Sequence, residues 1–294
     1  MTTQLRWIVS QSVSCLHAVD AIARGWPIVD ERLNTQLIEP ATALLHEIDA
    51  AGFVVPTFLR HLVPLADGID NNHQLAARAA TKSAGLAAAD EIYVGRIAGR
   101  IAEVEAAVRR AYPMLIDDLS LRAGPLREQW EARGPGFLKH AAQLTDERLL
   151  VPNADVLVVH PALGGGGVAH LPYNSVRIEA VLANPVPQIP EAVRLGWLLA
   201  QLNCDRPAFC ENILADRLPL VAQLALLPIA LAAGEYVELT RCDAATMELA
   251  LQTWHFDTKP DRRLAEAVVE WWGTYQETRP RWDVALVALD RMTA

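Results

Sequence analysis

Apolar residues recur at helical spacing through most of the chain. Between residues 86 and 112 they are separated by five, four, three and four positions, which places them on one face of a helix: Ile92, Ile97, Ile101, Val104 and Val108. Pro113 is expected to end this helix. A similar pattern predicts a helix over 31–51, bent or split at Pro40, and a helical stretch over 126–145 that breaks at residues 134–136.

The pattern changes after Pro152. Residues 154–162 are β-branched and apolar, and residues 174–182 alternate apolar and polar side chains with a period of two. These two segments predict a β-hairpin or short ribbon joined by a long glycine-rich connection. The prolines of 183–190 predict an extended linker. Helices are expected again over 191–202, 214–233, 244–254, 262–276 and 281–292, the third and fourth capped by Asp243 and Asp261.

The predicted fold is therefore mainly α (α+β), a large helical domain with one inserted β-hairpin or small sheet around a glycine-rich loop. Residues 1–150 form a helical N-terminal half, 151–190 the hairpin, glycine-rich loop and linker, and 191–294 a helical C-terminal half. We expect the three parts to pack as one compact domain.

Composition narrows the functional classes. The chain has 26 Lys and Arg against 35 Asp and Glu, a net charge of −9, and 52% hydrophobic residues. This balance excludes a disordered chain and disfavours nucleic-acid binding. The apolar run 218–233 has 16 residues, too few for a membrane span of about 20, and no transmembrane segment is expected. Four cysteines without a CxxC pair, and arginines far outnumbering lysines, predict a cytoplasmic, bacterial protein.

The segment from His160 to Tyr173 contains four consecutive glycines, Gly164, Gly165, Gly166 and Gly167. Backbone N–H groups of such a loop can bind an anionic ligand. The surrounding residues match neither the phosphate-binding GxxxxGK[ST] motif nor the dinucleotide-binding GxGxxG motif. A tightly packed or mobile hairpin tip is the alternative use of these glycines.

Residues that can carry chemistry surround this loop. In the predicted hairpin His160 and His170 can face each other, with three further polar side chains nearby, which makes a hydrolase site or a metal site conceivable: Tyr173, Arg177 and Glu179. Histidines that are simply hydrogen-bonded at strand ends are the alternative. No cofactor is identified. The zinc-peptidase motif HExxH is missing: His46-Glu47 lacks the second histidine, and the helix after residue 190 carries Glu191 and Arg194 but no histidine. The GxSxG motif is also missing.

Tryptophan outnumbers both phenylalanine and tyrosine, with eight residues against five of each. The adjacent Trp271 and Trp272 cannot both face one side of a helix, so one of them is expected at the surface or against a second element. Tryptophan is enriched in interfaces. Two functional hypotheses follow: a non-catalytic binding or assembly protein that binds itself, a protein partner or a small apolar ligand, and alternatively a hydrolase-type enzyme, metal-dependent or not, with its site at the His160–Glu179 hairpin.

Overall fold

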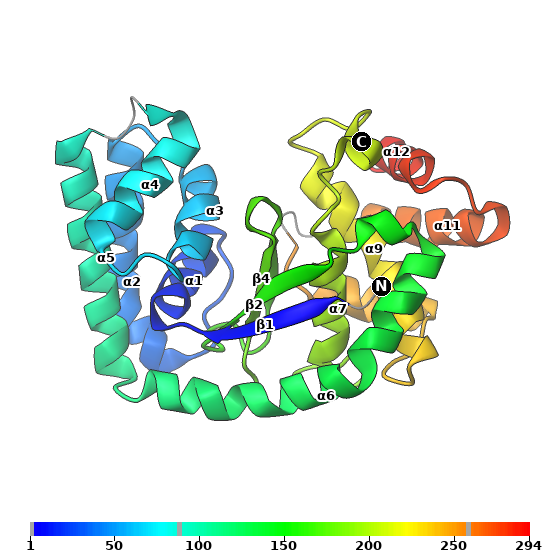
Figure 1. Ribbon diagram of the computed structural model, residues 1–294, viewed down its shortest axis with the longest axis horizontal. Coiled ribbons are helices and arrows are strands. Elements are labelled where there is room, and N and C mark those ends of the chain that lie inside the picture. The colour runs from blue at the N-terminus through cyan, green and yellow to red at the C-terminus, as the bar shows by residue number, and fades with distance from the viewer. Residues whose placement is uncertain (1–2, 87–89, 257–259) are drawn as a thin grey trace.

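A small mixed β-sheet lies between two groups of helices (Figure 1). The computed structural model describes residues 3–86, 90–256 and 260–294. The strands follow the order β1-β2-β4-β3, with β1 (Gln4–Val9), β2 (Asn153–Val159), β4 (Ser175–Glu179) and β3 (Gly167–His170). Strands β1 and β4 run parallel to β2, and β3 runs antiparallel to β4. The predicted mainly α (α+β) class is confirmed.

The predicted hairpin between 154–162 and 174–182 is wrong, because these two segments pair in parallel. Val156 of β2 lies opposite Val176 of β4, and the chain between them makes the crossover that a parallel pair requires. The hairpin is formed instead by β3 and β4, which are joined by a 3₁₀ turn over Leu171–Tyr173 and by Asn174 in the left-handed conformation. Strand β3 was not predicted, since its four residues are too short to show a period.

The first helices gather on one side of the sheet (Figure 1). They are α1 (Gln11–Ala23), α2 (Glu31–Ala50), α3 (Val55–Leu65), α4 (Asn72–Ala84) and α5 (Glu91–Ala111). Four of them begin at a side chain that accepts a hydrogen bond from the first turn: Ser10, Asp30, Asn71 and Asp90. The apolar stripe predicted on α5 is buried except for Ile92, which is 71% exposed in the first turn.

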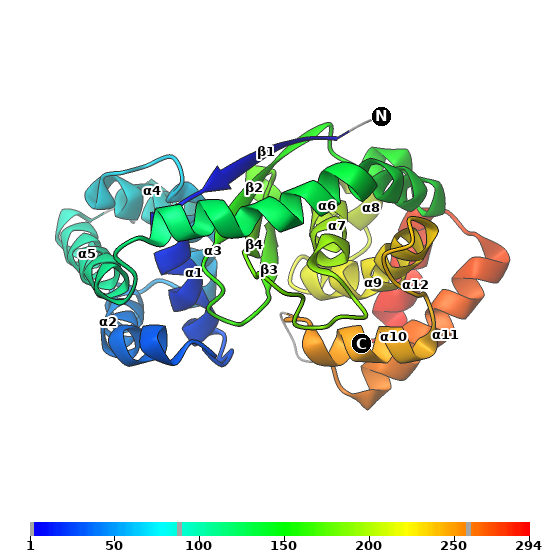
Figure 2. The ribbon, with the colours of Figure 1, turned by 90° about the horizontal axis from the view of Figure 1, so that it is seen from below.

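Helix α6 (Leu115–Leu144) runs along the sheet from the first group of helices to the second (Figure 2). It is continuous through Gly134, Pro135 and Gly136, so the predicted break is wrong. A β-carbon at position 134 would come within 2.4 Å of the Trp130 ring, and one at position 136 within 3.1 Å of Val237. These glycines therefore leave room for the Trp130 ring and for Val237 to pack closely against the backbone of α6.

The second group of helices follows β4 on the opposite side (Figure 1). It contains α7 (Glu191–Gln201), α8 (Pro207–Cys210), α9 (Leu218–Tyr236), α10 (Ala244–Thr253), α11 (Arg262–Thr278) and α12 (Trp282–Met292). By length and composition α9 passes as a membrane span, but 78% of its apolar window is buried inside the fold. This burial is typical of a core helix.

The adjacent tryptophans of α11 are both core residues. Trp271 and Trp272 are 3% and 4% exposed, and they pack with Tyr275 and with Trp282 of α12. The indole N–H of Trp271 donates to the Ala285 carbonyl oxygen at 2.8 Å. Neither side chain therefore offers a surface to a partner in this conformation, although both were predicted as interface candidates.

Candidate functional site

The glycine-rich loop folds around a carboxylate of its own chain. The Oε1 atom of Glu179, at the end of β4, accepts a hydrogen bond from the Leu163 N–H at 2.8 Å, and Oε2 accepts one from the Gly165 N–H at 2.6 Å. Gly165 has a φ of 133°, and a β-carbon there would lie 2.5 Å from Pro185. The loop amides thus bind an anion, as glycine loops do, but that anion is Glu179.

His17 of α1 completes the shell of Glu179. Its Nε2 atom lies 2.7 Å from Oε1 of Glu179, and both side chains are fully buried. Burial alone would raise the pKa of Glu179, but the hydrogen bonds from His17 and the two loop amides hold it below its usual value. Burial lowers the pKa of His17, so the imidazole is neutral near pH 7. This arrangement fixes α1 and the loop to the sheet.

A buried ion pair lies beside the hydrogen bond of His17 with Glu179. Arg177 of β4 donates to Asp20 of α1, which also accepts from Arg24 at 3.0 Å. Burial would raise the pKa of Asp20, but the two guanidinium groups lower it to about 2. Burial and the neighbouring Arg177 charge lower the pKa of His170 well below its usual value. Arg177 is therefore paired inside the fold, next to a neutral histidine.

The other predicted residues lie in separate places. Nε2 of His160 is 2.8 Å from Oδ2 of Asp30, an oxygen to which the Tyr112 hydroxyl also donates. The Tyr173 hydroxyl instead pairs with Nδ1 of His61 at 2.7 Å. The five residues predicted as one site therefore belong to three clusters. Within the described part of the chain, no group of three or more His, Cys, Asp and Glu side chains is arranged to hold a metal ion.

Polar side chains also contact the outer side of the glycine-rich loop. A β-carbon at Gly165 would lie 3.3 Å from Oε1 of Glu191, and one at Gly166 would lie 3.6 Å from Nδ1 of His255. Glu191 is the first residue of α7, and Arg194 follows one turn later. We call Glu191, Arg194, Trp254 and His255 the α7 cluster.

Hydrogen-bonding capacity is left unused in the α7 cluster. Glu191 and Arg194 are each 2% exposed, and their closest approach is an ion pair of 3.4 Å between Oε1 and Nη2. The buried atoms without a hydrogen-bond partner are Oε1 and Oε2 of Glu191, Nε and Nη1 of Arg194, Nε1 of Trp254 and Nδ1 of His255. The Glu179 side of the loop also has unpartnered atoms, on His17, His170, Ser175 and Arg177. Among the described residues, however, Glu191 is the acid with both carboxyl oxygens buried and unpartnered.

The electrostatics of the α7 cluster favour neutral groups around one cation. Burial, reinforced by the negative charge of Glu179, raises the pKa of Glu191 above its ordinary value despite the nearby Arg194. Burial and the Arg194 charge lower the pKa of His255 to about 4. The guanidinium carbon of Arg194 lies 5.6 Å from the centre of the Trp254 ring. Arg194 thus carries a positive charge in an apolar, aromatic surrounding.

The rim of the α7 cluster reaches the surface. His255 packs against Trp26 with 4.9 Å between ring centres, and both side chains are half-buried. The Arg24 guanidinium lies 5.0 Å from the centre of the Trp26 ring on that side. In contrast, His17 and Glu179 have no exposed side-chain area. Because its rim reaches solvent, the α7 cluster is a better candidate for a ligand site than the buried side chains around Glu179.

Sequence reasoning did not single out the α7 cluster. Glu191 was interpreted as a helix start, Trp254 as one of eight tryptophans, and His255 was not considered. The sequence carried one signal of this site, because Glu191 and Arg194 are the charged residues of an otherwise mostly apolar helix. The structure shows that all eleven residues of this helix are buried. Charged side chains in a fully buried helix need partners, and the ion pair of Glu191 with Arg194 leaves four of their polar atoms without a hydrogen bond.

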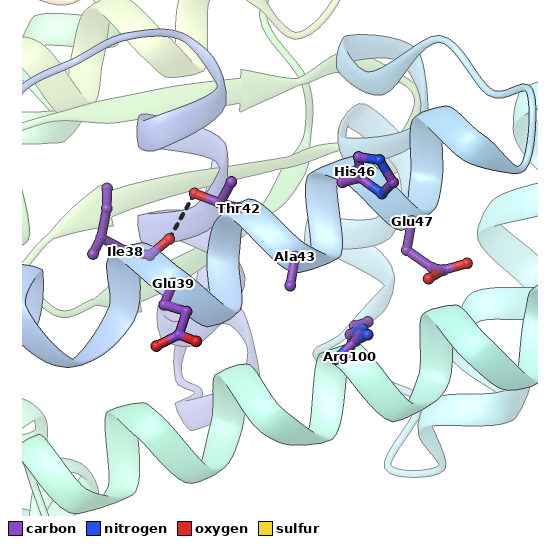
Figure 3. A pocket seen from close by; sticks show the side chains of 7 residues that line it. All are labelled: Ile38, Glu39, Thr42, Ala43, His46, Glu47 and Arg100. Atoms are coloured by element: carbon purple, nitrogen blue, oxygen red, sulfur yellow. Dashed lines mark hydrogen bonds between the residues drawn. The ribbon is translucent and has the colours of Figure 1, made fainter.

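A groove between α2 and α5 is a second candidate (Figure 3). It is lined by Ile38, Glu39, Thr42, Ala43, His46, Glu47 and Arg100. Its buried acid, Glu47, is held by Arg96, with 2.7 Å between Oε1 and Nε. His46 is exposed. Because the buried charge already has a counter-ion, this groove has less need of a ligand than the α7 cluster has.

Comparison of the chain with protein-family models, with curated proteins and with solved structures found no match.

Proposed function

We propose that this chain is a non-catalytic binding protein that takes a small polar molecule where the glycine-rich loop meets the start of α7. One observation carries the proposal: Glu191 and Arg194 are almost completely buried, yet four of their polar atoms have no hydrogen-bond partner. A buried polar group without a partner costs about 1–3 kcal/mol. A bound molecule that supplies the missing partners would recover this free energy.

Binding is favoured over catalysis by the kinds of groups present. The α7 cluster supplies an acid, a guanidinium, an indole and an imidazole, none of which is a hydroxyl or thiol nucleophile. The residues expected for a hydrolase are engaged elsewhere: Glu179 with the loop, Arg177 with Asp20, and His160 with Asp30. Their pairings support a structural role for these side chains.

Binding of a ligand is also favoured over assembly, because Trp271 and Trp272 are buried within one chain. Self-association and a protein partner remain predictions, as does the lack of nucleic-acid binding that a net charge of −9 favours. A bacterial, cytoplasmic setting is supported by the arginine-rich composition and by the four cysteines, all of which are free thiols.

A double variant tests both the function and its location. Replacing a poorly bonded buried ion pair by apolar residues of similar volume is often neutral or stabilising. We therefore expect Glu191→Leu/Arg194→Met to melt at or above the wild-type temperature, yet to lose the thermal shifts that a panel of small polar molecules produces in the wild type. At 100 times its dissociation constant, a ligand stabilises by about 2.7 kcal/mol, which such an assay resolves.

The matched control is Glu47→Leu/Arg96→Met, which removes the ion pair beside the α2–α5 groove. It should keep every ligand-induced shift of the wild type. The proposal fails if no compound stabilises the wild type. It also fails if the α7 double variant keeps the shifts while the control loses them, since the ligand would then bind in the groove.

A further inference from the structure

Three buried hydrogen-bond donors without a partner lie on two side chains of the α7 cluster. Arg194 has unpartnered Nε and Nη1 atoms, and Trp254 has an unpartnered indole Nε1, which can only donate. Burial and the charge of Glu179 raise the pKa of Glu191, which favours its protonated form, and a protonated carboxyl also donates. The missing partner must therefore present several acceptor atoms close together.

The positive charge of Arg194 also favours a ligand with acceptor atoms. The Arg194 guanidinium is a buried cation, and its ion pair with Glu191 is long, with 3.4 Å between Nη2 and Oε1, while burial raises the pKa of that carboxyl. The ionised Glu179 is on the other side of the loop, and its oxygens are taken by His17, Leu163 and Gly165. A buried cation is stabilised strongly by an anion that accepts its hydrogen bonds.

Resting on the proposed function, we infer that the molecule bound at the α7 cluster carries a carboxylate, held by the guanidinium of Arg194 and the indole N–H of Trp254. Two oxygens in one plane match the donor geometry of a guanidinium. A guanidinium also matches phosphate, but the Leu163 and Gly165 amides, which could help to hold its additional oxygens and charge, already bind Glu179.

The surrounding rings indicate what the carboxylate is attached to. Trp26 and His255 are half-buried at the cluster with 4.9 Å between ring centres, and the buried ring of Trp254 packs against Trp197 at 4.8 Å. Flat aromatic surfaces favour an apolar or aromatic body over a sugar or a polyol. An aromatic monocarboxylate such as benzoate is therefore the simplest probe.

Three probes with the same phenyl ring test the inference in the wild-type chain by saturation-transfer NMR. Benzoate should bind, benzamide should bind at least about tenfold more weakly because it lacks the charge, and benzylamine should not bind. Inorganic phosphate should not displace benzoate. Equal or tighter binding of benzamide or benzylamine would overturn the carboxylate inference, and so would displacement by phosphate.

Variants then locate the carboxylate. Arg194→Lys keeps the charge but loses the planar donor pair, and should weaken benzoate about tenfold or more. Arg217→Lys, on an arginine paired with Asp290 in the second group of helices, should leave benzoate binding unchanged. Retained binding in Arg194→Lys with a lowered melting temperature would show a purely structural arginine and overturn the inference.

The two proposals fail in different ways. If the panel of polar molecules stabilises the wild type through the α7 cluster but benzoate does not bind, the carboxylate inference falls and the binding function stands. If neither benzoate nor any panel member binds, both fall.

Discussion

Replacing Glu179 by glutamine tests how the glycine-rich loop is held. The carboxylate accepts hydrogen bonds from Leu163, Gly165 and His17 at 2.6–2.8 Å in a fully buried place. Glutamine keeps one accepting oxygen and replaces the other by an NH₂ group, which faces a backbone N–H or the imidazole. One strong hydrogen bond is lost, worth about 1.5–3 kcal/mol, and a buried donor is left unpaired at a cost of about 1–3 kcal/mol.

We therefore expect Glu179→Gln to lower the free energy of unfolding by about 3 kcal/mol, which for a chain of this size lowers the melting temperature by roughly 6–12 °C. Urea unfolding at pH 7.5, followed by circular dichroism, measures the loss. Hydrogen exchange at the Leu163 and Gly165 amides should also accelerate. Glu103→Gln, on an exposed acid paired with Arg100, should change stability by less than about 0.5 kcal/mol. A Glu179→Gln variant within 1 kcal/mol of the wild type, roughly the cost of a single weak hydrogen bond, would refute this reasoning.

Further predictions concern stability and packing. His17 and His170 are buried with lowered pKa values, so the unfolded chain binds more protons below its histidine pKa of about 6.5, and stability should fall by up to about 1.4 kcal/mol per pH unit for each histidine between pH 6.5 and 5. Urea unfolding at pH 7.5, 6 and 5 measures this slope, and a flat profile would show that both imidazoles take up protons in the fold as readily as in the unfolded chain. Gly196→Ala would bring a β-carbon within 2.2 Å of Phe137 and should cost about 1–3 kcal/mol, whereas Gly99→Ala, with nothing within 4 Å, should stabilise α5 by about 0.5–1 kcal/mol. Equal melting temperatures of these two alanine variants would contradict the packing at Phe137. Trp271→Ala should destabilise by about 3–5 kcal/mol without changing the mass in solution, as sedimentation analysis would report, while a shift in mass with little loss of stability would support the interface role.

Local signals in the sequence predicted local structure well. Asp243 and Asp261 were expected to cap helices, and each accepts a hydrogen bond from the first turn of α10 and α11. The helix expected over 126–145 also exists, but it is continuous where glycine and proline predicted a break, and Gly134 leaves room there for the Trp130 ring. The direction of strand pairing was not predictable, because an alternating pattern indicates a strand but does not show which strand it pairs with, or whether the pair is parallel.

The site was predictable only in part, for the same reason. The glycine-rich loop and Glu179 stand close in sequence, and both belong to one arrangement. His17 lies 162 residues from Glu179, and no spacing rule joins them. Glu191 and His255 meet at the loop because α7 and the segment after α10 pack there. Such contacts depend on tertiary packing. Residues far apart in the chain leave no periodic pattern in a single sequence that would show that they meet.

The most direct test of the proposed binding function is a native mass spectrum of the untagged chain, recorded before and after exposure to each member of the panel of small polar molecules and to benzoate. We expect a mass increment of one small molecule per chain that Glu191→Leu/Arg194→Met abolishes and Glu47→Leu/Arg96→Met retains. A bare chain mass in every sample, or an increment that survives the α7 double variant, would contradict a ligand site between the glycine-rich loop and α7.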